Sequence, residues 1–545
     1  MWSQILQGEE EGRWRAALEA VATDAPRVLV ATSVGSWQHG LAVESLVAVA
    51  LTLRGARVEF SLCDAALPAC IAIKYGGVPP ATLLAGEHPP RCPHCFGPGA
   101  AALQETGLRV NRLSDGLSPD DMATADALSE TVPYEDIPHF RLDGARVGEH
   151  ALAGALRYTA KGDLSDEPEA ERILRRYFRA AIRTVIGMDR LIADRGIDTV
   201  LVNHGIYVPQ GLVREAAARR GTRIVTWNPS YKKQTLIFSH DDSYHHTMIR
   251  EDPGVWEDVV LDEQRSAVLD EYLESRRRGS HDWIWFNKEV TDDNAARLTS
   301  LGVDGSRPIV TLLSSVVWDA QLHYESNAFP SMVDWLRYTV AYFATRPNLQ
   351  LVVRIHPAEV TGTNPSRQKL GDELAQYFPT LPENVVMIPP ESDLSTYALL
   401  DRSNAVLIYN TKMGIESSAR GLPTIVAGEA WIRDKGFSLD AVTPLGYRRL
   451  LDRLPFGGRM TSSDLQRARR YAYHFFFRRM IPVELLDVGD KGRFQFGFDS
   501  LAPLMPGATP GLDVICRGLL DRRPFVYDGP DRMAERTEGP GFVAA

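Results

Sequence analysis

The chain has 545 residues, of which 44% are hydrophobic and 24% charged, a composition typical of globular proteins. One core stops growing at roughly 250–300 residues, so the length predicts more than one domain. The net charge of −10 argues against nucleic acid as a partner, and no apolar run reaches the ~18–20 residues of a membrane span. The acidic start lacks the layout of a secretory signal. We therefore expect a cytoplasmic protein, with peripheral contact at the inner face of the membrane as an open alternative.

The first half of the chain alternates strands and helices. Residues 27–64 read as strand, loop, helix and strand, and residues 198–230 repeat this order after a long charged helix over about 166–195. Such βαβ units form parallel sheets with right-handed crossovers. We therefore predict a doubly wound Rossmann-like domain over residues 1–300, with an irregular Pro-, Gly- and Cys-rich stretch at 66–135.

Four of the five cysteines fall in a Cys-rich insertion at about residues 63–100, as Cys63, Cys70, Cys92 and Cys95. In a chain expected to be cytoplasmic, such a cluster favours a metal over disulfides, and four thiolates make a closed zinc site. Small buried side chains placed by chance explain the pattern equally well, and an iron–sulfur cluster is a minor alternative. The predicted cofactor is a structural zinc, and we expect no catalytic metal.

The second half restarts the alternation after residues 250–300, which we expect to join the halves. Predicted strands at PIVTLL, LQLVVRI, AVLIYN and PTIVAG are separated by helical segments. This alternation predicts a second Rossmann-like domain over residues 301–481, which faces the first across a cleft. Its last helix, residues 462–481, clusters Arg and aromatic side chains, which is typical of a closing helix and, less often, of a membrane contact. The tail, residues 482–545, is expected to pack back on the domains.

The most specific pattern is LIYNTKMGIESSARGLPTIVAG, residues 407–428. A buried strand ends at Asn410 and Thr411, Gly414 opens a helix, and Glu416 lies in its first turn. Amides at a helix start bind phosphate, and a carboxylate there accepts hydrogen bonds from ribose hydroxyls. Because loop, helix and acid occur together, we favour a nucleotide site over the alternative that Glu416 only complements the helix dipole.

A second polar group, RIHPAE, follows a predicted core strand. Ligands in open α/β sheets bind at the carboxyl ends of strands, which makes Arg354, His356 and Glu359 candidates for donor binding. Pro357 favours extended geometry at the histidine. We expect His356, rather than Arg354, to reach the cleft directly and to assist a departing phosphate as a cation or hydrogen-bond donor. A purely structural histidine is the alternative.

The stretch PPESDLSTY adds three candidates near the same strand ends. Glu391, Ser392 and Ser395 lie at a predicted helix start, where they would meet the base or phosphate of a donor. Helix capping alone explains them nearly as well.

The base that would accept a proton from the acceptor hydroxyl has four candidates. His39 lies in a Gly-containing strand-to-helix loop, His204 follows the strand TVLV, and Asp241 belongs to FSHDDSYHH. Asp319 in WDAQ is the fourth, and the pattern does not rank them. The His- and Asp-rich run lacks the i, i+4 spacing of a helical zinc motif, so we interpret it as a polar loop on the acceptor side.

Two Rossmann-like halves with these motifs in the second half resemble GT-B glycosyltransferases. The stretch from about residue 308 to 440 resembles bacterial capsule polysaccharide biosynthesis proteins, which are similar to capsule Kdo transferases and, more distantly, to GT-B sialyltransferases with an HP motif. The resemblance implies that His356 contacts the nucleotide phosphate. It also implies that a Ser-x-x-Gly-x-Glu pattern holds the nucleotide, here with Asn410 and Thr411 where Ser is usual.

The resemblance implies a glycosyltransferase with an acceptor-binding first domain and a donor-binding second domain. It would move a sugar from a CMP- or UDP-activated donor to a glycan or lipid-linked glycan acceptor in surface or capsular polysaccharide biosynthesis. A nucleotide-sugar epimerase and a polyol-phosphate transferase are alternatives on the same fold, and a glycan-assembly scaffold is the alternative without catalysis.

Overall fold

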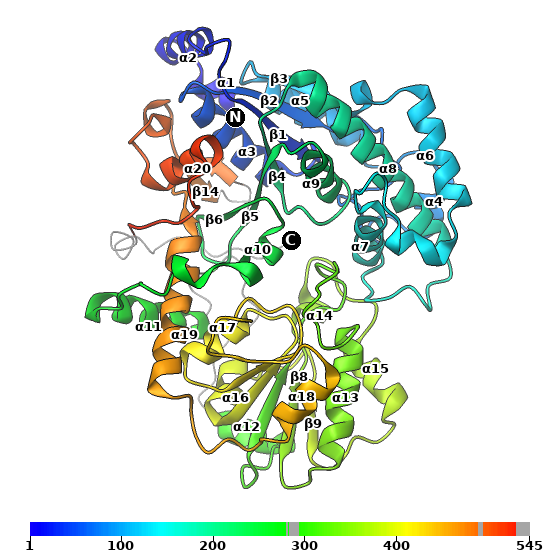
Figure 1. The fold of residues 1–545 in the computed structure, drawn as a ribbon, viewed down its shortest axis with the longest axis vertical. Coiled ribbons are helices and arrows are strands. Elements are labelled where there is room, and N and C mark those ends of the chain that lie inside the picture. Colours follow the sequence, from blue (N-terminus) through cyan, green and yellow to red (C-terminus); the bar gives the residue numbers. More distant parts are fainter. Residues whose placement is uncertain (279–281, 283–293, 489–493, 530–545) are drawn as a thin grey trace.

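The computed structural model describes residues 1–278, 282, 294–488 and 494–529, which are built around two large sheets (Figure 1). The first sheet has the strand order β13-β6-β5-β4-β1-β2-β3, and the second has the order β12-β11-β10-β7-β8-β9. All pairs are parallel except those that β6 makes with β5 and β13. The predicted α/β class with two doubly wound sheets is thus confirmed.

The first sheet is buried on both faces. Its strands are β1 (Arg27–Ser33), β2 (Arg57–Leu62), β3 (Arg109–Arg112), β4 (Thr199–Asn203), β5 (Arg223–Pro229), β6 (Thr235–His240) and β13 (Ile481–Pro482). Along β1, Val28 and Val30 belong to the core beneath α3 (Gln38–Thr52), whereas Leu29 and Ala31 belong to the core beneath α7 (Val147–Thr159), α8 (Ala170–Arg195) and α9 (Gln210–Arg219). Successive side chains point to opposite faces, which explains the unbroken apolar run of this strand.

The stretch at 66–135, which the composition predicted to be irregular, contributes a sheet strand and several helices. It holds α4 (Pro80–Ala85), a 3-10 turn (Cys92–His94), α5 (Phe96–Gln104), β3, a second 3-10 turn (Leu113–Gly116) and α6 (Pro119–Thr131). At the start of α6, the Ser118 hydroxyl accepts from the Asp121 amide at 3.2 Å and the Ser118 amide donates to the Asp121 carboxylate at 2.7 Å. Pro and Gly therefore separate short elements here instead of preventing them.

The predicted charged helix near 166–195 is α8, the longest helix described. Its carboxyl end is set by Gly196, whose φ of +57° is the left-handed conformation that terminates many helices. The helix packs Ile173, Phe178 and Ile182 into the core of the first sheet.

The second sheet is wholly parallel. Its strands are β7 (Ile309–Leu313), β8 (Gln350–Arg354), β9 (Val385–Ile388), β10 (Ser403–Ile408), β11 (Thr424–Val426) and β12 (Leu439–Asp440). One core lies with α13 (Met332–Ala344), α15 (Leu370–Tyr377) and α18 (Pro444–Leu451). Another involves α11 (Glu263–Arg278), α16 (Thr396–Arg402), α17 (Met413–Ala419) and α19 (Ser462–Tyr473). Thus α11, although it precedes residue 300, packs with helices of the second half. Part of the predicted join, residues 279–281 and 283–293, lies outside the described residues.

The chain returns to the first sheet after the second. Helix α19 runs into a π-helical turn (His474–Arg479) and then into β13, which pairs with β6 (Figure 1). Tyr471 and Phe475 are buried, as expected of a closing helix. Beyond β13, α20 (Pro510–Asp521) packs against α3 and places Ile515 in the first core. Within the ranges given above, no helix has the length and apolar character needed to cross a bilayer.

The remaining short elements complete the layers. They are α1 (Trp2–Ile5), α2 (Glu9–Glu19), a 3-10 turn (Tyr134–His139), α10 (Tyr244–Arg250), a 3-10 turn (Pro253–Val255), α12 (Asn294–Ser300), α14 (Ala358–Thr361), the hairpin β14 (Leu486–Val488) and β15 (Phe494–Phe496), and a 3-10 turn (Ala502–Leu504).

Candidate functional site

Loops at the carboxyl ends of the parallel strands of the two sheets contact one another. The Tyr207 hydroxyl, after β4, donates to Asp319 Oδ1 at 2.5 Å and accepts from the Ala320 amide at 2.8 Å, after β7. The rings of Tyr231, after β5, and Trp431, after β11, lie with centroids 6.1 Å apart. We call these two sets of strand ends the facing edges. Ligands of open α/β sheets bind at such positions.

His356 lies on the facing edge of the second sheet, two residues after β8. Its amide donates to Ser314 Oγ at 2.9 Å, and its Nδ1 accepts from the Ala358 amide at 3.0 Å. Burial and the charges of Lys412 and Arg354 lower the pKa of the imidazole to about 4. The ring is therefore neutral at pH 7 with its proton on Nε2, so the hydrogen-bond donor expected from the sequence is favoured over the cation.

Arg354 and Glu359, the other candidates in this motif, hold neighbouring loops. Arg354 is buried, and its guanidinium donates to the carbonyls of Pro389 and Ser392, at 3.0 Å for the latter. Glu359 is also buried, and its carboxylate accepts from the Leu370 amide at 3.1 Å at the start of α15. Both side chains thus have structural partners, and His356 is the member of the motif that is only half-buried.

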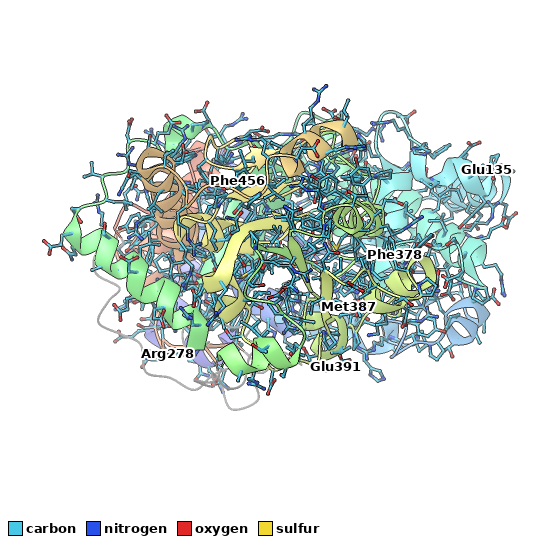
Figure 2. The ribbon with its side chains drawn as sticks, turned by 90° about the horizontal axis from the view of Figure 1, so that it is seen from below. Glu135, Arg278, Phe378, Met387, Glu391 and Phe456 are labelled. Atoms are coloured by element: carbon cyan, nitrogen blue, oxygen red, sulfur yellow. The ribbon has the colours of Figure 1, made fainter. Side chains whose placement is uncertain are left out.

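The three candidates after β9 differ in exposure. Glu391 is exposed, and its labelled side chain lies at the margin of the molecule when it is viewed from the second half (Figure 2). The Ser392 hydroxyl accepts from the Leu394 amide at 3.3 Å. Ser395 is buried and precedes α16 without a side-chain capping hydrogen bond. This loop is therefore tied to β8 through Arg354 and presents Glu391 to solvent.

Asn410 bridges two neighbouring loops at the end of β10. It accepts a short hydrogen bond from the Ser315 hydroxyl, and its Nδ2 donates to Glu429 Oε1 at 2.9 Å. Glu429 is buried, and burial raises its pKa. The amide side chain therefore links the loops that follow β7 and β11.

Thr411 and Gly414 shape the turn into α17. Thr411 Oγ1 accepts from the Met413 amide at 3.3 Å. A Cβ at Gly414 would lie 2.6 Å from Ile408 Cδ1 and 3.0 Å from Ile432 Cδ1, so no larger residue fits without movement. The glycine is explained by close packing of α17 on β10.

Glu416 is wholly buried, and its carboxylate is already engaged. Tyr397 donates to Oε2 at 2.6 Å, and Arg276 Nε lies 3.0 Å from Oε1. Arg276 also forms a short ion pair with Asp282, to which the Tyr272 hydroxyl donates at 2.8 Å. Although burial raises the pKa of Glu416, Arg276 and Lys412 more than offset it and lower the pKa. In this structure the carboxylate therefore belongs to an internal ion-pair network.

Two of the four base candidates come together at the facing edges. His204 follows β4, and its amide donates to the Trp227 carbonyl at 3.0 Å. Burial and the Arg157 charge lower its pKa to about 4, while nearby Asp319 opposes this shift. Its Nδ1 is buried without a hydrogen-bond partner among the residues that the structure describes. A neutral imidazole and an exposed carboxylate thus lie together beside the Tyr207 hydroxyl.

The other two base candidates have other partners. His39 begins α3 and packs edge-on against Phe494 of β15, with centroids 4.7 Å apart. Asp241 pairs with Arg522 at 2.9 Å. Because β6 runs antiparallel to β5, the end of β6 lies at the amino end of its neighbour, and the Asp241 amide donates to the Ile224 carbonyl there. Its place in the topology separates Asp241 from the facing edges.

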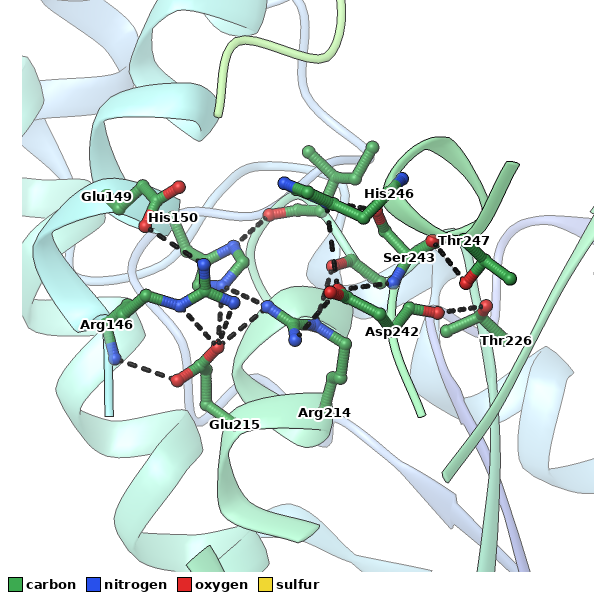
Figure 3. Close-up of polar contacts among 12 residues, drawn as sticks. Arg146, Glu149, His150, Arg214, Glu215, Thr226, Asp242, Ser243, His246 and Thr247 are labelled. Carbon is green, nitrogen blue, oxygen red and sulfur yellow. Dashed lines mark hydrogen bonds and ion pairs between the residues drawn. The ribbon is translucent and has the colours of Figure 1, made fainter. Parts of the chain in front are cut away.

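The His- and Asp-rich run divides between two environments. His240 Nε2 lies 2.9 Å from the Arg523 carbonyl of the tail. His246 enters a polar network shown in Figure 3, where its Nδ1 lies 2.8 Å from Ser243 Oγ and Asp242 pairs with Arg214 at 3.1 Å. Across the described ranges, no group of three or more His, Cys, Asp or Glu side chains is arranged to hold a metal ion.

The cysteines Cys63, Cys70, Cys92 and Cys95 are half-buried free thiols. Burial raises the pKa of Cys63 to about 12, and the proximity of Cys92 adds to this shift. Burial likewise raises the pKa of Cys70, with contributions from Cys63, Cys92 and Cys95. Among the described residues, the four side chains do not form a metal-holding group.

Four further side chains at the facing edges were not among the predicted site residues. They are Tyr231 after β5, Lys412 after β10, and Glu429 and Trp431 after β11. The Lys412 ammonium lies 4.0 Å from the Tyr231 ring centre. Each follows a strand of a parallel sheet, so the strand-end rule that selected His356 would also have found them.

One family model matches part of the chain. Residues 279–444 match the model described as capsule polysaccharide biosynthesis protein. The predicted resemblance is confirmed over this segment. The segment carries β7 to β11 together with His356, Lys412 and Glu416. A search of curated proteins found no match.

Several solved structures are distantly similar. The KpsC beta Kdo 2,4 transferase of Thermosulfurimonas dismutans is 15% identical over 56% of this chain and 86% of that chain, with a TM-score of 0.35. The beta Kdo 2,7 transferase of the same protein is 14% identical over 52% and 79%, with a TM-score of 0.29. A UDP-GlcNAc 2-epimerase from Neisseria meningitidis bound to UDP-GlcNAc is 11% identical over 82% and 94%, with a TM-score of 0.26.

Proposed function

We propose that this chain is a GT-B glycosyltransferase of surface or capsular polysaccharide biosynthesis. It transfers a sugar from a nucleotide-activated donor to a hydroxyl of a glycan acceptor. The family match over residues 279–444 supports the pathway class, and the two parallel sheets with contacting carboxyl ends support the fold. The observation that carries the proposal is the neutral His356 with its proton on Nε2, held on a facing edge close to a lysine ammonium.

The second half binds the donor, and His356 donates a hydrogen bond to its phosphate. The hydrogen bond from the imidazole N–H becomes stronger as negative charge develops on the leaving phosphate. An interaction that is stronger in the transition state than in the ground state accelerates the reaction. Asn410, Thr411, Gly414 and Glu416 build the adjoining wall. Arg354, Glu359, Glu391, Ser392 and Ser395 belong to the same donor side as supporting residues. The donor nucleotide is CMP or UDP.

The first half binds the acceptor, and the pair His204 and Asp319 supplies the base. The two groups lie on opposite facing edges and are near enough for Asp319 to act on the pKa of His204. A neutral imidazole accepts a proton, and a carboxylate beside it stabilises the resulting charge. The positions of His39 and Asp241 favour neither for this role.

Nucleotide release tests this function directly. Purified protein is incubated with CMP- and UDP-activated sugars and with capsular or lipid-linked glycan fragments, and nucleotide and glycan mass are followed by chromatography and mass spectrometry. Transfer predicts release coupled to a glycan longer by one sugar, and its reduction by about 10²–10⁴-fold in His204→Gln or Asp319→Asn. Sugar interconversion without release would indicate an epimerase, transfer of a phosphate-bearing polyol would indicate the second alternative, and no turnover would favour a scaffold.

A structural zinc at Cys63, Cys70, Cys92 and Cys95 stays a prediction. The clustering of the four cysteines in the sequence supports it, and closure would require their side chains to turn towards a common centre. Protein purified without added metal should then contain one zinc per chain by elemental analysis, and Cys92→Ser with Cys95→Ser should remove it. Peripheral membrane contact is tested by flotation with anionic vesicles.

A further inference from the structure

Lys412 carries an ammonium group that makes no hydrogen bond to the part of the chain that the structure describes. It is about four-fifths buried, with 19% of its side chain exposed. Its ion-pair partner is Asp282 at 4.0 Å, whose oxygens already serve Arg276 and Tyr272. Leaving a largely buried charge without hydrogen bonds is costly unless a ligand completes its shell.

Two more deeply buried lysines of this chain, Lys435 and Lys161, have internal partners. Lys435 Nζ donates to the carbonyls of Ile249 and Glu251 at 2.9 and 2.8 Å. Lys161 Nζ lies 2.7 Å from Asp166. These groups have internal hydrogen-bond acceptors, whereas Lys412 lies at the facing edges with only the longer contacts to Asp282 and the Tyr231 ring among the described residues. A buried cation of this kind suits an anionic ligand.

The surroundings of Lys412 indicate which anion it suits. Its ammonium lies 4.0 Å from the Tyr231 ring centre, on the first half, and close enough to His356 to lower the pKa of that imidazole. His356 is a neutral imidazole there, and because its Nδ1 accepts from the Ala358 amide its proton is on Nε2. One cation after β10 and one neutral imidazole after β8, on either side of β7, match the oxygens of a phosphate.

We propose that Lys412 binds the phosphate of the nucleotide-activated donor and stabilises the charge that it gains as the sugar departs. This inference rests on the proposed function. During transfer, the bond between the anomeric carbon and the phosphate oxygen breaks, and its electron pair stays on the phosphate. The acceptor oxygen bonds to the anomeric carbon. Its proton passes to the general base formed by His204 and Asp319. In this role Lys412 touches the leaving group and is therefore a catalytic residue. It supplies a phosphate contact next to Asn410 and Thr411, which stand where Ser is usual.

Titration calorimetry tests the assignment with CMP, UDP and inorganic pyrophosphate as probes. Lys412→Met should weaken binding of the recognised nucleotide by about 10- to 100-fold, the loss typical of a charge-assisted hydrogen bond, and Lys412→Arg should restore most of it. The matched control is Lys232→Met. Its side chain is also half-buried and makes no hydrogen bond to a described residue, but its ammonium lies 4.4 Å from the Phe477 ring centre instead of beside His356. It should keep binding within about twofold.

The outcomes separate the inference from the proposed function. Equal nucleotide binding by wild type and Lys412→Met would overturn the inference and leave the proposed function standing, as would equal losses in the two lysine variants. If no nucleotide binds but pyrophosphate binds in a Lys412-dependent way, the anion site stands and the donor assignment fails. If neither binds to a wild type whose thermal midpoint shows it to be folded, both fail.

Discussion

Replacing Glu416 by glutamine should destabilise the protein far more than a ligand contact would. The carboxylate is fully buried between Arg276 at 3.0 Å and the Tyr397 hydroxyl at 2.6 Å. Removing one partner of a buried ion pair costs about 3–5 kcal/mol, and here Arg276 loses one of its two carboxylate partners and keeps Asp282. At about 2–4 °C per kcal/mol for domains of this size, the thermal midpoint should fall by about 6–20 °C.

The assay is thermal unfolding at pH 7, followed by circular dichroism without ligand. Glu383→Gln, at an exposed position of the same half, is the control and should shift the midpoint by about 1 °C or less. Tyr397→Phe removes one hydrogen bond to a charged group and should cost about 1.5–3 kcal/mol, less than Glu416→Gln. The double variant should fall short of the sum, since the two groups share a network.

A midpoint unchanged in Glu416→Gln, together with loss of nucleotide binding, would refute this reasoning. It would mean that the carboxylate leaves its internal partners and accepts hydrogen bonds from a ribose, as the sequence pattern suggested.

Three further perturbations follow from buried groups. Burial raises the pKa of Glu44 to about 7, so the folded protein holds a proton that the unfolded chain loses, and stability falls as pH rises from about 4.5 to 7. Urea unfolding at pH 5 and 8 should show that Glu44→Gln removes about 3 kcal/mol of this fall. An equal fall in the variant and the wild type would contradict the prediction. Although burial raises the pKa of Glu251, Arg479 and His474 lower it to about 2. This carboxylate therefore stabilises the fold above about pH 4.5, and about 3 kcal/mol of stability is lost as pH falls towards 2. Glu251→Gln should flatten this acid part of the stability curve, and a fall as steep as that of the wild type would refute the pairing. Gly414→Ala should cost about 1–3 kcal/mol by overpacking, whereas Gly457→Ala, with open space around it, should be nearly neutral; equal effects would contradict the packing argument.

The fold was predictable because strand and helix periods are local properties. The βαβ units at 27–64 and 198–230 appear as β1, α3, β2 and as β4, α9, β5. The irregular prediction for 66–135 failed because Pro and Gly content marks element boundaries, and whether short elements form between them depends on packing partners such as the α8 helix.

The site was predictable only where a strand end alone decides position. His356 lies on a facing edge because β8 is a parallel strand. Asp241 follows a strand just as closely, but β6 is antiparallel, and no local pattern reveals this. The roles of Glu416 and Glu359 could not be read from the sequence either, because their partners Arg276 and the Leu370 amide come from other segments. Lys412 could have been selected by the same strand-end rule.

Binding of nucleotides to His356→Ala is the most direct test of a donor site at the facing edges. Thermal shift and calorimetry should show that CMP or UDP stabilises the wild type, by about 2.7 kcal/mol at 100 times its dissociation constant. His39→Ala is the control, since His39 packs against Phe494. The donor site predicts that His356→Ala loses at least about tenfold in affinity while His39→Ala binds as the wild type does. Equal affinity in both variants, or loss in His39→Ala alone, would contradict a donor phosphate at His356.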